Sequence, residues 1–311
     1  MPDLAELAAI VRHAPGVRAK RDLALVAGAL PGVDGDDAAL VEHAGEQLVL
    51  GGEAILPAFV ASNPDGAGAA AVVTSLADVR AMGGRPLALV DTLVSPDSEH
   101  AKATLEGLAR TADLLGVRVA GGHLTLGGPP ALSAFCTGVA RVPLRAAAAR
   151  PGDALVAAFS LEGEYLADGP FWSSLAARDP GRLRTDGEAL VEVAEGGLAH
   201  AARDVSMPGV AGSLLQLSEL AKVGATLDLD ALPRPDAAPL ERWLVTFPSF
   251  GFVLAARPGR AEQACAAFRA RGLAAAVCGA FDATGRLALS LGSEQATVWD
   301  LGREPLTGLA R

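Results

Sequence analysis

The alternation of strand-like and helix-like segments between residues 47 and 142 constrains the fold more than any other feature. Apolar residues recur at spacings of three and four over 64–82 and again over 98–115, which predicts two helices, the second capped by Ser98 and ended by Gly116. Strands are predicted at 47–50, 86–94, 117–120 and 132–142. The strand at 86–94 is almost continuously apolar, so we expect burial on both of its faces. This succession is typical of an α/β or α+β layer, and we predict a two-domain α+β protein whose N-terminal domain is an α/β sheet domain.

The second half of the chain carries a similar mixture of elements without repeating the sequence. Helices are predicted at 188–202, 210–222 and 260–271. Gly224 is predicted to end the second of these helices. Strands are predicted at 154–159, 225–229, 243–247, 250–256, 274–281 and 286–291. The featureless run 146–149 separates the halves, so we predict two domains, 1–150 and 151–311, the second a sandwich-like α/β domain.

Composition and charge exclude several classes of protein. With 311 residues, half of them hydrophobic and a fifth charged, the chain has enough apolar residues for a large core. The net charge of −10 argues against binding to nucleic acid, which requires clustered Lys and Arg. No apolar run reaches the roughly 18 residues of a membrane span. Three separated cysteines predict buried free thiols, and we expect a cytoplasmic protein without a leader segment.

The run Asp34-Gly35-Asp36-Asp37 places adjacent carboxylates on a glycine turn. Carboxylate oxygens are ligands that Mg²⁺ prefers, and Mg²⁺ in proteins usually completes its shell with waters and substrate phosphates. The turn therefore indicates metal-assisted nucleotide chemistry. The alternative is an exposed turn whose carboxylates are simply hydrated.

Four segments of the chain resemble those of one enzyme superfamily. Residues 35–39 are similar to the Gly-Asp-Asp-Ala segment of thiamine-monophosphate kinase, and 77–86 resembles the shared Asn-Asp-Ile-x-Ala-Met-Gly-Ala-x-Pro segment. Residues 121–123 stand where the family has Gly-Gly-Asp-Thr, and 204–206 resembles its Asp-Ile-Ser-Asp segment. The chain is identified as a member of the superfamily of aminoimidazole ribonucleotide synthetase, thiamine-monophosphate kinase and selenophosphate synthetase, and it is most similar to the aminoimidazole ribonucleotide synthetase-related branch.

The resemblance implies a fold and a cofactor. It implies that the N-terminal domain pairs with its twin into an eight-stranded barrel, so that the protein is a homodimer. It also implies that ATP binds near the interface between the two paired domains and that Mg²⁺ holds its phosphates. Phosphoryl transfer depends mostly on positioning and charge neutralisation, which agrees with clustered carboxylates.

Individual roles follow from the same resemblance. The implied metal ligands are Asp36, Asp37, Glu53 and Asp78. Asp36 and Asp37 are also implied in nucleotide binding, together with Gly121, Gly122 and Lys20. The implied catalytic residues are Asp204 and His123. Lys20 belongs to a basic lead-in that is implied to fold over the triphosphate as a lid, and its alternative is a frayed terminus.

Three positions depart from the family pattern. Glu53 and His123 stand where the family has Asp and an acidic residue, and Met207 replaces the second Asp of the Asp-x-Ser-Asp segment. His123 on a predicted glycine loop could contact phosphate, transfer protons or bind metal, or do none of these. Asp204 has the alternative of capping the helix that begins near Val210.

The expected activity is ATP- and Mg²⁺-dependent phosphoryl transfer to a small molecule, because Gly-Asp-Asp-Ala is similar to the kinase lineage. One alternative is an ATP-dependent cyclo-ligase of the aminoimidazole type. Another is a nucleotide-binding partner subunit without turnover, indicated by Met207 and His123.

Overall fold

The computed structural model describes residues 3–30, 32–166 and 169–310. The chain forms two compact units with mixed α/β structure. The five-stranded unit consists of Asp37–Arg141 and Asp179–Val191, and the seven-stranded unit consists of Met1–Asp36, Val142–Arg178 and Glu192–Arg311. The chain thus crosses between units more than once, whereas the prediction of domains 1–150 and 151–311 has a single boundary. Within the described ranges, no helix is long and apolar enough to cross a membrane.

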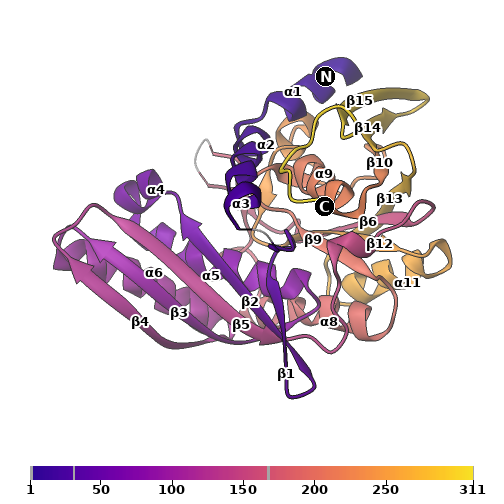
Figure 1. The fold of residues 1–311 in the computed structure, drawn as a ribbon. Helices are drawn as coiled ribbons and strands as arrows, with labels where there is room; N and C mark the ends of the chain where they lie inside the picture. The colour runs from indigo at the N-terminus through magenta and orange to yellow at the C-terminus, as the bar shows by residue number, and fades with distance from the viewer. Residues whose placement is uncertain (1–2, 31, 167–168, 311) are drawn as a thin grey trace. The chain divides into compact units, whose positions relative to one another are not determined.

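The five-stranded unit is a mixed sheet with two long helices on one face (Figure 1). The strand order is β1-β2-β5-β3-β4, and only the β3–β4 pair is parallel within this sheet. Its strands are β1 (Ala39–His43), β2 (Glu46–Ile55), β3 (Arg85–Ser95), β4 (Arg118–Leu126) and β5 (Ala131–Val139). Its helices are α4 (Pro57–Ser62), α5 (Pro64–Ala81), α6 (Ser98–Leu115) and α7 (Pro180–Asp186). The covering helices are α5 and α6.

The two long helices confirm the periodicity prediction. Asn63 caps α5 by accepting from the Gly66 amide, and Pro64 occupies its first turn. The N-cap of α6 is Asp97, whose side chain accepts from the His100 amide, so the prediction of Ser98 as the cap was wrong by one residue. Gly116 ends α6 at φ 72°, a left-handed conformation that glycine adopts without strain.

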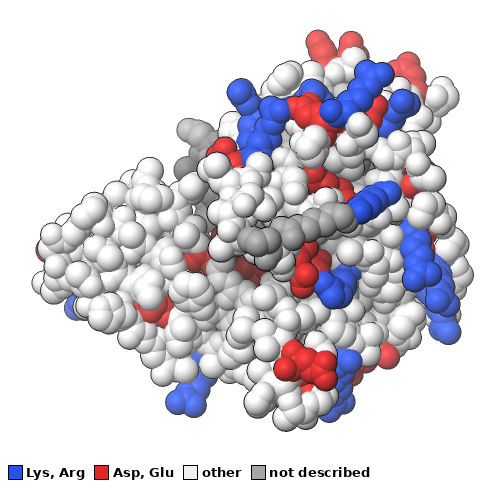
Figure 2. Space-filling view, in the orientation of Figure 1, with Lys and Arg blue, Asp and Glu red and all other residues white. Residues whose placement is uncertain are grey.

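The opposite face of this sheet is exposed in the single chain, and the expected burial of 86–94 on both faces stays a prediction that requires a second copy. In β3, buried and more exposed residues alternate. Leu50, Val90 and Phe135 are exposed on the uncovered face, where the Phe135 ring lies against Gly52. Figure 2 shows this face with few charged side chains. Apolar residues therefore occur on both sides of the strand, although helices cover only one side.

The seven-stranded unit is built on a mixed sheet with the order β15-β14-β10-β13-β6-β12-β9. These strands are β6 (Ala154–Phe159), β9 (Ala201–Asp204), β10 (Gly224–Asp228), β12 (Gly251–Ala256), β13 (Ala274–Asp282), β14 (Arg286–Leu291) and β15 (Glu294–Asp300). A small sheet is formed by β7 (Glu164–Tyr165), β8 (Phe171–Ser173) and β11 (Phe247–Pro248). All residues of β6 and β12 are buried, so these central strands are covered on both faces.

The described helices of this unit are α1 (Leu4–His13), α2 (Pro15–Ala19), η1 (Lys20–Asp22), α3 (Leu23–Ala29), η2 (Ala146–Ala148), α9 (Gly209–Ala221), α10 (Leu240–Trp243) and α11 (Pro258–Arg269). The sequence patterns missed several of them, including α1. A further helix, α8 (Glu188–Glu195), spans a boundary between the units. Asp3 and Glu6 form a capping box at the start of α1, whose apolar side chains are buried with α9 in one core. The basic lead-in is therefore helical and packed from Asp3 onward, and the alternative of a frayed segment was wrong.

Three other predictions in this unit were wrong. The predicted strand 243–247 begins with the last residue of α10, because Leu240 and Trp243 are buried at helical spacing. The predicted helix 188–202 ends earlier, since Ala201–Asp204 pairs with β12 as an additional strand. Lys222, at φ 57°, caps α9 in the left-handed conformation in place of the predicted Gly224, which begins β10.

The three cysteines are free and buried, as predicted. Burial raises the pKa of the Cys136 thiol to about 12 and that of Cys265 to about 11, because an anionic sulfur is poorly solvated in an apolar core. Burial also raises the pKa of Cys278. These thiols therefore stay protonated and unreactive near neutral pH.

Candidate metal and nucleotide site

Asp37 and Asp78 are brought together in the five-stranded unit although they are 41 positions apart in the sequence. Asp37 lies two residues before β1, and Asp78 lies in the last turn of α5. Each offers a carboxylate oxygen within 4.8 Å of the other. Asp78 is only 5% exposed, and Asp37 is half-buried. Two carboxylates at this separation repel one another unless a cation or hydrogen-bond donors compensate them, and an oxygen-binding cation fits the pair.

Gly51 makes room for the Asp78 carboxylate. A Cβ atom at Gly51 would lie 3.0 Å from Asp78 Cβ and 3.5 Å from Asp78 Oδ2. The same Cβ would lie 3.5 Å from Ala38 Cβ, beside Asp37. The glycine of β2 thus lets the end of α5 and the start of β1 approach the same strand. Glu53 is half-buried on the same face of β2, two residues farther along.

Asp36 has a different environment from its neighbour. Its Oδ1 accepts from the Ala146 amide at 2.8 Å, and its Oδ2 lies 3.4 Å from Arg145 Nε. The side chain is 3% exposed. Arg145 also pairs with Asp34 at 3.0 Å, so both acids are tied to the same segment of the seven-stranded unit. These contacts favour a positioning role for Asp36, and its predicted role as a metal ligand stays a prediction.

Gly121, Gly122 and His123 lie inside the edge strand β4, so the predicted glycine loop was wrong. All nine residues of β4 are exposed. A Cβ atom at Gly121 would meet nothing within 4 Å, which leaves its backbone open to a ligand. His123 pairs in register with Thr92 on the uncovered face of the sheet, whereas α5, which carries Asp78, covers the other face. The structure therefore does not bring His123 to Asp37 and Asp78.

Asp91 is a buried acid that the sequence patterns missed. It lies on the helix-covered face of β3, and a Cβ atom at the neighbouring Gly122 would collide with its carboxylate. Burial raises the pKa of Asp91, while a hydrogen bond from its own backbone opposes this shift. The sequence feature that could have identified Asp91 is that it is the single acidic residue within an otherwise apolar predicted strand.

Asp204 is the last residue of β9 in the seven-stranded unit and is 6% exposed. It pairs with Phe252 in the sheet, and the following amide of Val205 donates to the Gly251 carbonyl at 2.8 Å. The N-cap of α9 is Pro208, without any side-chain cap, so the alternative that Asp204 caps this helix was wrong. Met207 is half-buried in the turn between them, and its carbonyl packs against Gly16 of α2.

The basic lead-in is docked on the seven-stranded unit. Arg12 stacks 4.4 Å from the centre of the Trp299 ring and pairs with Glu304 at 2.7 Å. Arg21 also pairs with Glu304. Lys20, between these two arginines in the sequence, is half-buried in η1. A lid built from this segment would have to break the contacts with Glu304 and Trp299, and the role of Lys20 stays a prediction.

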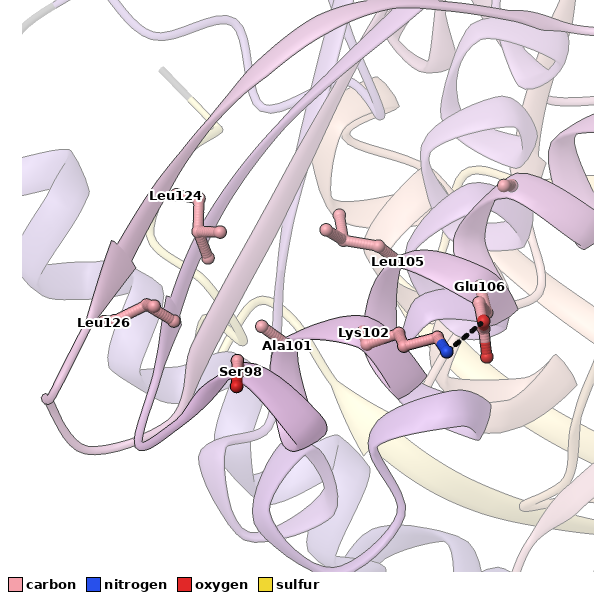
Figure 3. Close-up of a pocket in the computed structure, with 8 residues that line it drawn as sticks. Ser98, Ala101, Lys102, Leu105, Glu106, Leu124 and Leu126 are labelled. Carbon is pink, nitrogen blue, oxygen red and sulfur yellow. Dashed lines mark ion pairs between the residues drawn. The ribbon is translucent and has the colours of Figure 1, made fainter.

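A separate apolar groove lies between α6 and the edge strand β4 (Figure 3). Its volume is about 370 Å³, and Leu124 and Leu126 of β4 face α6 across it. Lys102 and Glu106 form an ion pair of 3.7 Å at one side. None of the predicted site residues lines this groove, so it is distinct from the paired carboxylates.

Family comparison assigns both halves of the chain. The model for the AIR synthase related protein, N-terminal domain, matches residues 35–140, and the model for its C-terminal domain matches residues 150–292. The chain therefore belongs to the AIR synthase-related family, as the sequence motifs predicted.

Two curated relatives cover most of the chain. An uncharacterized protein of Synechocystis sp. is 35% identical over 276 residues, which are 88% of this chain and 86% of that protein. Selenide, water dikinase of Myxococcus xanthus is 33% identical over 246 residues, which are 71% of this chain and 69% of the relative.

Solved structures share the fold at lower identity. PurLQS from Thermotoga maritima superimposes with a TM-score of 0.79 at 23% identity, covering 99% of this chain and 52% of that chain. AaThiL complexed with AMPPCP and TMP superimposes with a TM-score of 0.68 at 17% identity, covering 88% of this chain and 95% of that one. This chain spans about half the length of the matched PurL chains.

Proposed function

We propose that the protein catalyses ATP- and Mg²⁺-dependent phosphoryl transfer to a small molecule, and that Asp37 and Asp78 hold the magnesium. The observation that carries this proposal is the approach of their carboxylate oxygens to within 4.8 Å beside Gly51. Two oxygen ligands leave positions for waters and phosphate oxygens, which is the coordination Mg²⁺ usually adopts. Bound there, the metal would neutralise charge on the triphosphate.

Other residues take supporting roles in this proposal. Glu53 is a half-buried acid on the helix-covered face of β2 and is proposed to assist at the metal. Gly121 is in register with Val90 and lies with His123 on the uncovered face, so its role in nucleotide binding stays a prediction. Asp204 orients the acceptor oxygen for attack, as the resemblance of 204–206 to the family segment implies. The relatedness to selenide, water dikinase and the shared fold of AaThiL with AMPPCP support a reaction that uses ATP. A cytoplasmic location stays a prediction.

The first experiment measures ATP binding by calorimetry with and without Mg²⁺, followed by release of ADP or AMP with candidate acceptors. Selenide and TMP are suitable acceptors, because they occur in the names of the kinase-like relative and the complexed neighbour. We expect binding that requires Mg²⁺, and release of ADP or AMP with one acceptor class. Equal ATP binding with and without the metal would contradict the proposed site.

A cyclo-ligase is the second candidate, favoured by the TM-score of 0.79 with PurLQS. A kinase releases a phosphorylated product, whereas a ligase uses the phosphate only to activate an oxygen and releases inorganic phosphate. FGAR, the ligand of another T. maritima PurL structure, is the acceptor to test, with ammonia added because conversion of its amide to an amidine needs a nitrogen donor. ³¹P NMR of the products separates the two reactions.

Met207→Asp tests whether this branch retains catalysis. If Met207 contacts an apolar part of substrate or adenine, the new carboxylate will weaken ATP binding and turnover, because a charge would be desolvated without a partner. We expect this outcome, since methionine adapts to irregular apolar surfaces. Calorimetry and ADP release measure both effects. Tighter Mg²⁺-dependent binding without turnover would instead favour the partner-subunit alternative.

We also propose a homodimer in which the exposed face of the five-stranded sheet and the edge strand β4 pair with a second copy to close the barrel. Leu50, Val90 and Phe135 supply the apolar contact, and an unpaired edge strand is a site for further pairing. Light scattering at micromolar concentration should give twice the chain mass, and Phe135→Asp should give a monomer. Leu25→Asp, at a residue 77% exposed in the other unit, is the matched control. A monomeric wild-type protein would contradict the barrel.

A further inference from the structure

Glu219 of α9 receives an unusual number of hydrogen bonds from the C-terminal segment. The amides of Leu306 and Thr307 donate to its Oε1 at 2.8 Å and 3.2 Å, and the Thr307 amide also lies 2.9 Å from Oε2. The Thr307 hydroxyl donates to Oε2 at 2.5 Å, and the Gly308 amide lies 3.3 Å from Oε1. Glu219, Leu306 and Thr307 are all buried. A buried carboxylate with this many donors fixes the segment 306–308 against the helix.

The fixed segment continues directly to the acidic turn. The Thr307 hydroxyl accepts from the Leu309 amide at 3.1 Å, which extends the hydrogen-bonded chain by two residues. Leu309 is buried against Gly35, since a Cβ atom at Gly35 would lie 3.1 Å from Leu309 Cβ. Leu220, next to Glu219, would lie 2.9 Å from the same Cβ. Gly35 therefore packs against Leu220 of α9 and against Leu309, and the Glu219 contact holds the segment that carries Leu309.

Gly35 has little freedom to move away from this support. Its φ of 76° is in the left-handed region, and the Arg203 guanidinium donates to its carbonyl at 3.2 Å. The next residue, Asp36, is held by the Ala146 amide. Beside the segment, a cavity of about 320 Å³ is lined by Glu219, Gly308 and Ala310.

We propose that Glu219 is a positioning residue for the metal site, which it supports by holding Leu309 beneath Gly35 and thereby the turn that leads into Asp37. This inference rests on the proposed function, because it concerns the same acidic turn. All of the contacts that carry it lie within the seven-stranded unit. The C-terminal segment is then part of the metal-binding apparatus, although it supplies no ligand.

The test uses Glu219→Gln and Leu309→Ala in the full chain. The amide group of Gln would face backbone N–H groups, so at least one donor loses its acceptor. Leu309→Ala keeps these bonds but removes the Leu309 Cδ1 atom, which lies 3.3 Å from the Cβ position at Gly35. Both variants should increase hydrogen exchange of peptides covering 32–38. Both should raise the Mg²⁺ concentration for half-maximal ATP binding by roughly tenfold, the size typical of residues that orient ligands. Leu309→Met should restore both readouts.

Controls separate this inference from general loss of stability and from failure of the proposed function. Glu294→Gln, an exposed residue of β15, should change neither readout. Exchange of the buried strand β6 is the internal reference, and an increase there equal to that at 32–38 would overturn the inference. If the wild-type protein binds no Mg²⁺-ATP, the proposed function fails, while local exchange at 32–38 still decides whether Glu219 holds the turn. Unchanged exchange in both variants would overturn the inference even if ATP binds.

Discussion

Asp78→Asn is expected to weaken Mg²⁺-dependent ATP binding at least about tenfold, or about 1.4 kcal/mol, as measured by calorimetry. The substitution keeps the shape of the side chain over Gly51 and removes one negative charge from the pair with Asp37. Less triphosphate charge is then compensated through the metal. Asp37→Asn should have an effect of the same sign, because the two carboxylates share one cation in the proposed site.

Asp113→Asn is the matched control, since Asp113 is an exposed residue of α6 in the same unit. Thermal unfolding of each variant shows whether the fold is retained. A folded Asp78→Asn protein with wild-type binding would refute the metal assignment. Asp36→Asn adds a useful contrast, because loss of the acceptor for the Ala146 amide should lower stability more than the dependence on Mg²⁺.

Asp204→Asn is expected to lower turnover on the order of 100-fold while ATP binding changes much less. The physical reason is that a carboxylate can accept the proton of the attacking oxygen and an amide cannot, and general base catalysis contributes at least about this factor. Steady-state ADP release gives the turnover, and calorimetry on the same preparation gives the binding. This comparison requires an acceptor found in the first experiment.

Asp236→Asn, an exposed aspartate in the seven-stranded unit, serves as the control for this substitution. Wild-type turnover in Asp204→Asn would remove Asp204 from the catalytic set. Parallel losses of binding and turnover would instead identify it as a metal ligand. The two measurements thus assign different chemical roles to the same buried carboxylate.

Local patterns predicted much of the secondary structure correctly. The helices α5, α6, α9 and α11 were found because their apolar residues follow the helical repeat and glycine, proline or polar caps end them. Missed elements include α1 and β15, although Asp3 and Glu6 form a capping box at the start of α1. The strand β4 was predicted too short, because its glycines read as a loop while pairing with β3 extends it to Leu126.

The candidate site was also predicted only in part from the sequence. The sequence identified Asp36, Asp37 and Asp78 as chemically related acids through motif resemblance, and it also predicted the glycine turn that precedes them. It could not distinguish Asp36 from Asp37, which are adjacent and chemically identical. Their partners distinguish them: Asp36 meets the Ala146 amide, whereas Asp37 approaches Asp78.

The sequence by itself determined the family, the acidic turn and the principal helices, because each depends on residue types at short, regular spacings. Only the tertiary structure decided that Gly51 leaves room for the Asp78 side chain and that His123 lies on the uncovered face of the sheet. It also decided that Glu219 binds the C-terminal segment that packs against Gly35. These are contacts between residues remote in sequence. They arise from how strands pair and helices pack, which local periodicity does not encode.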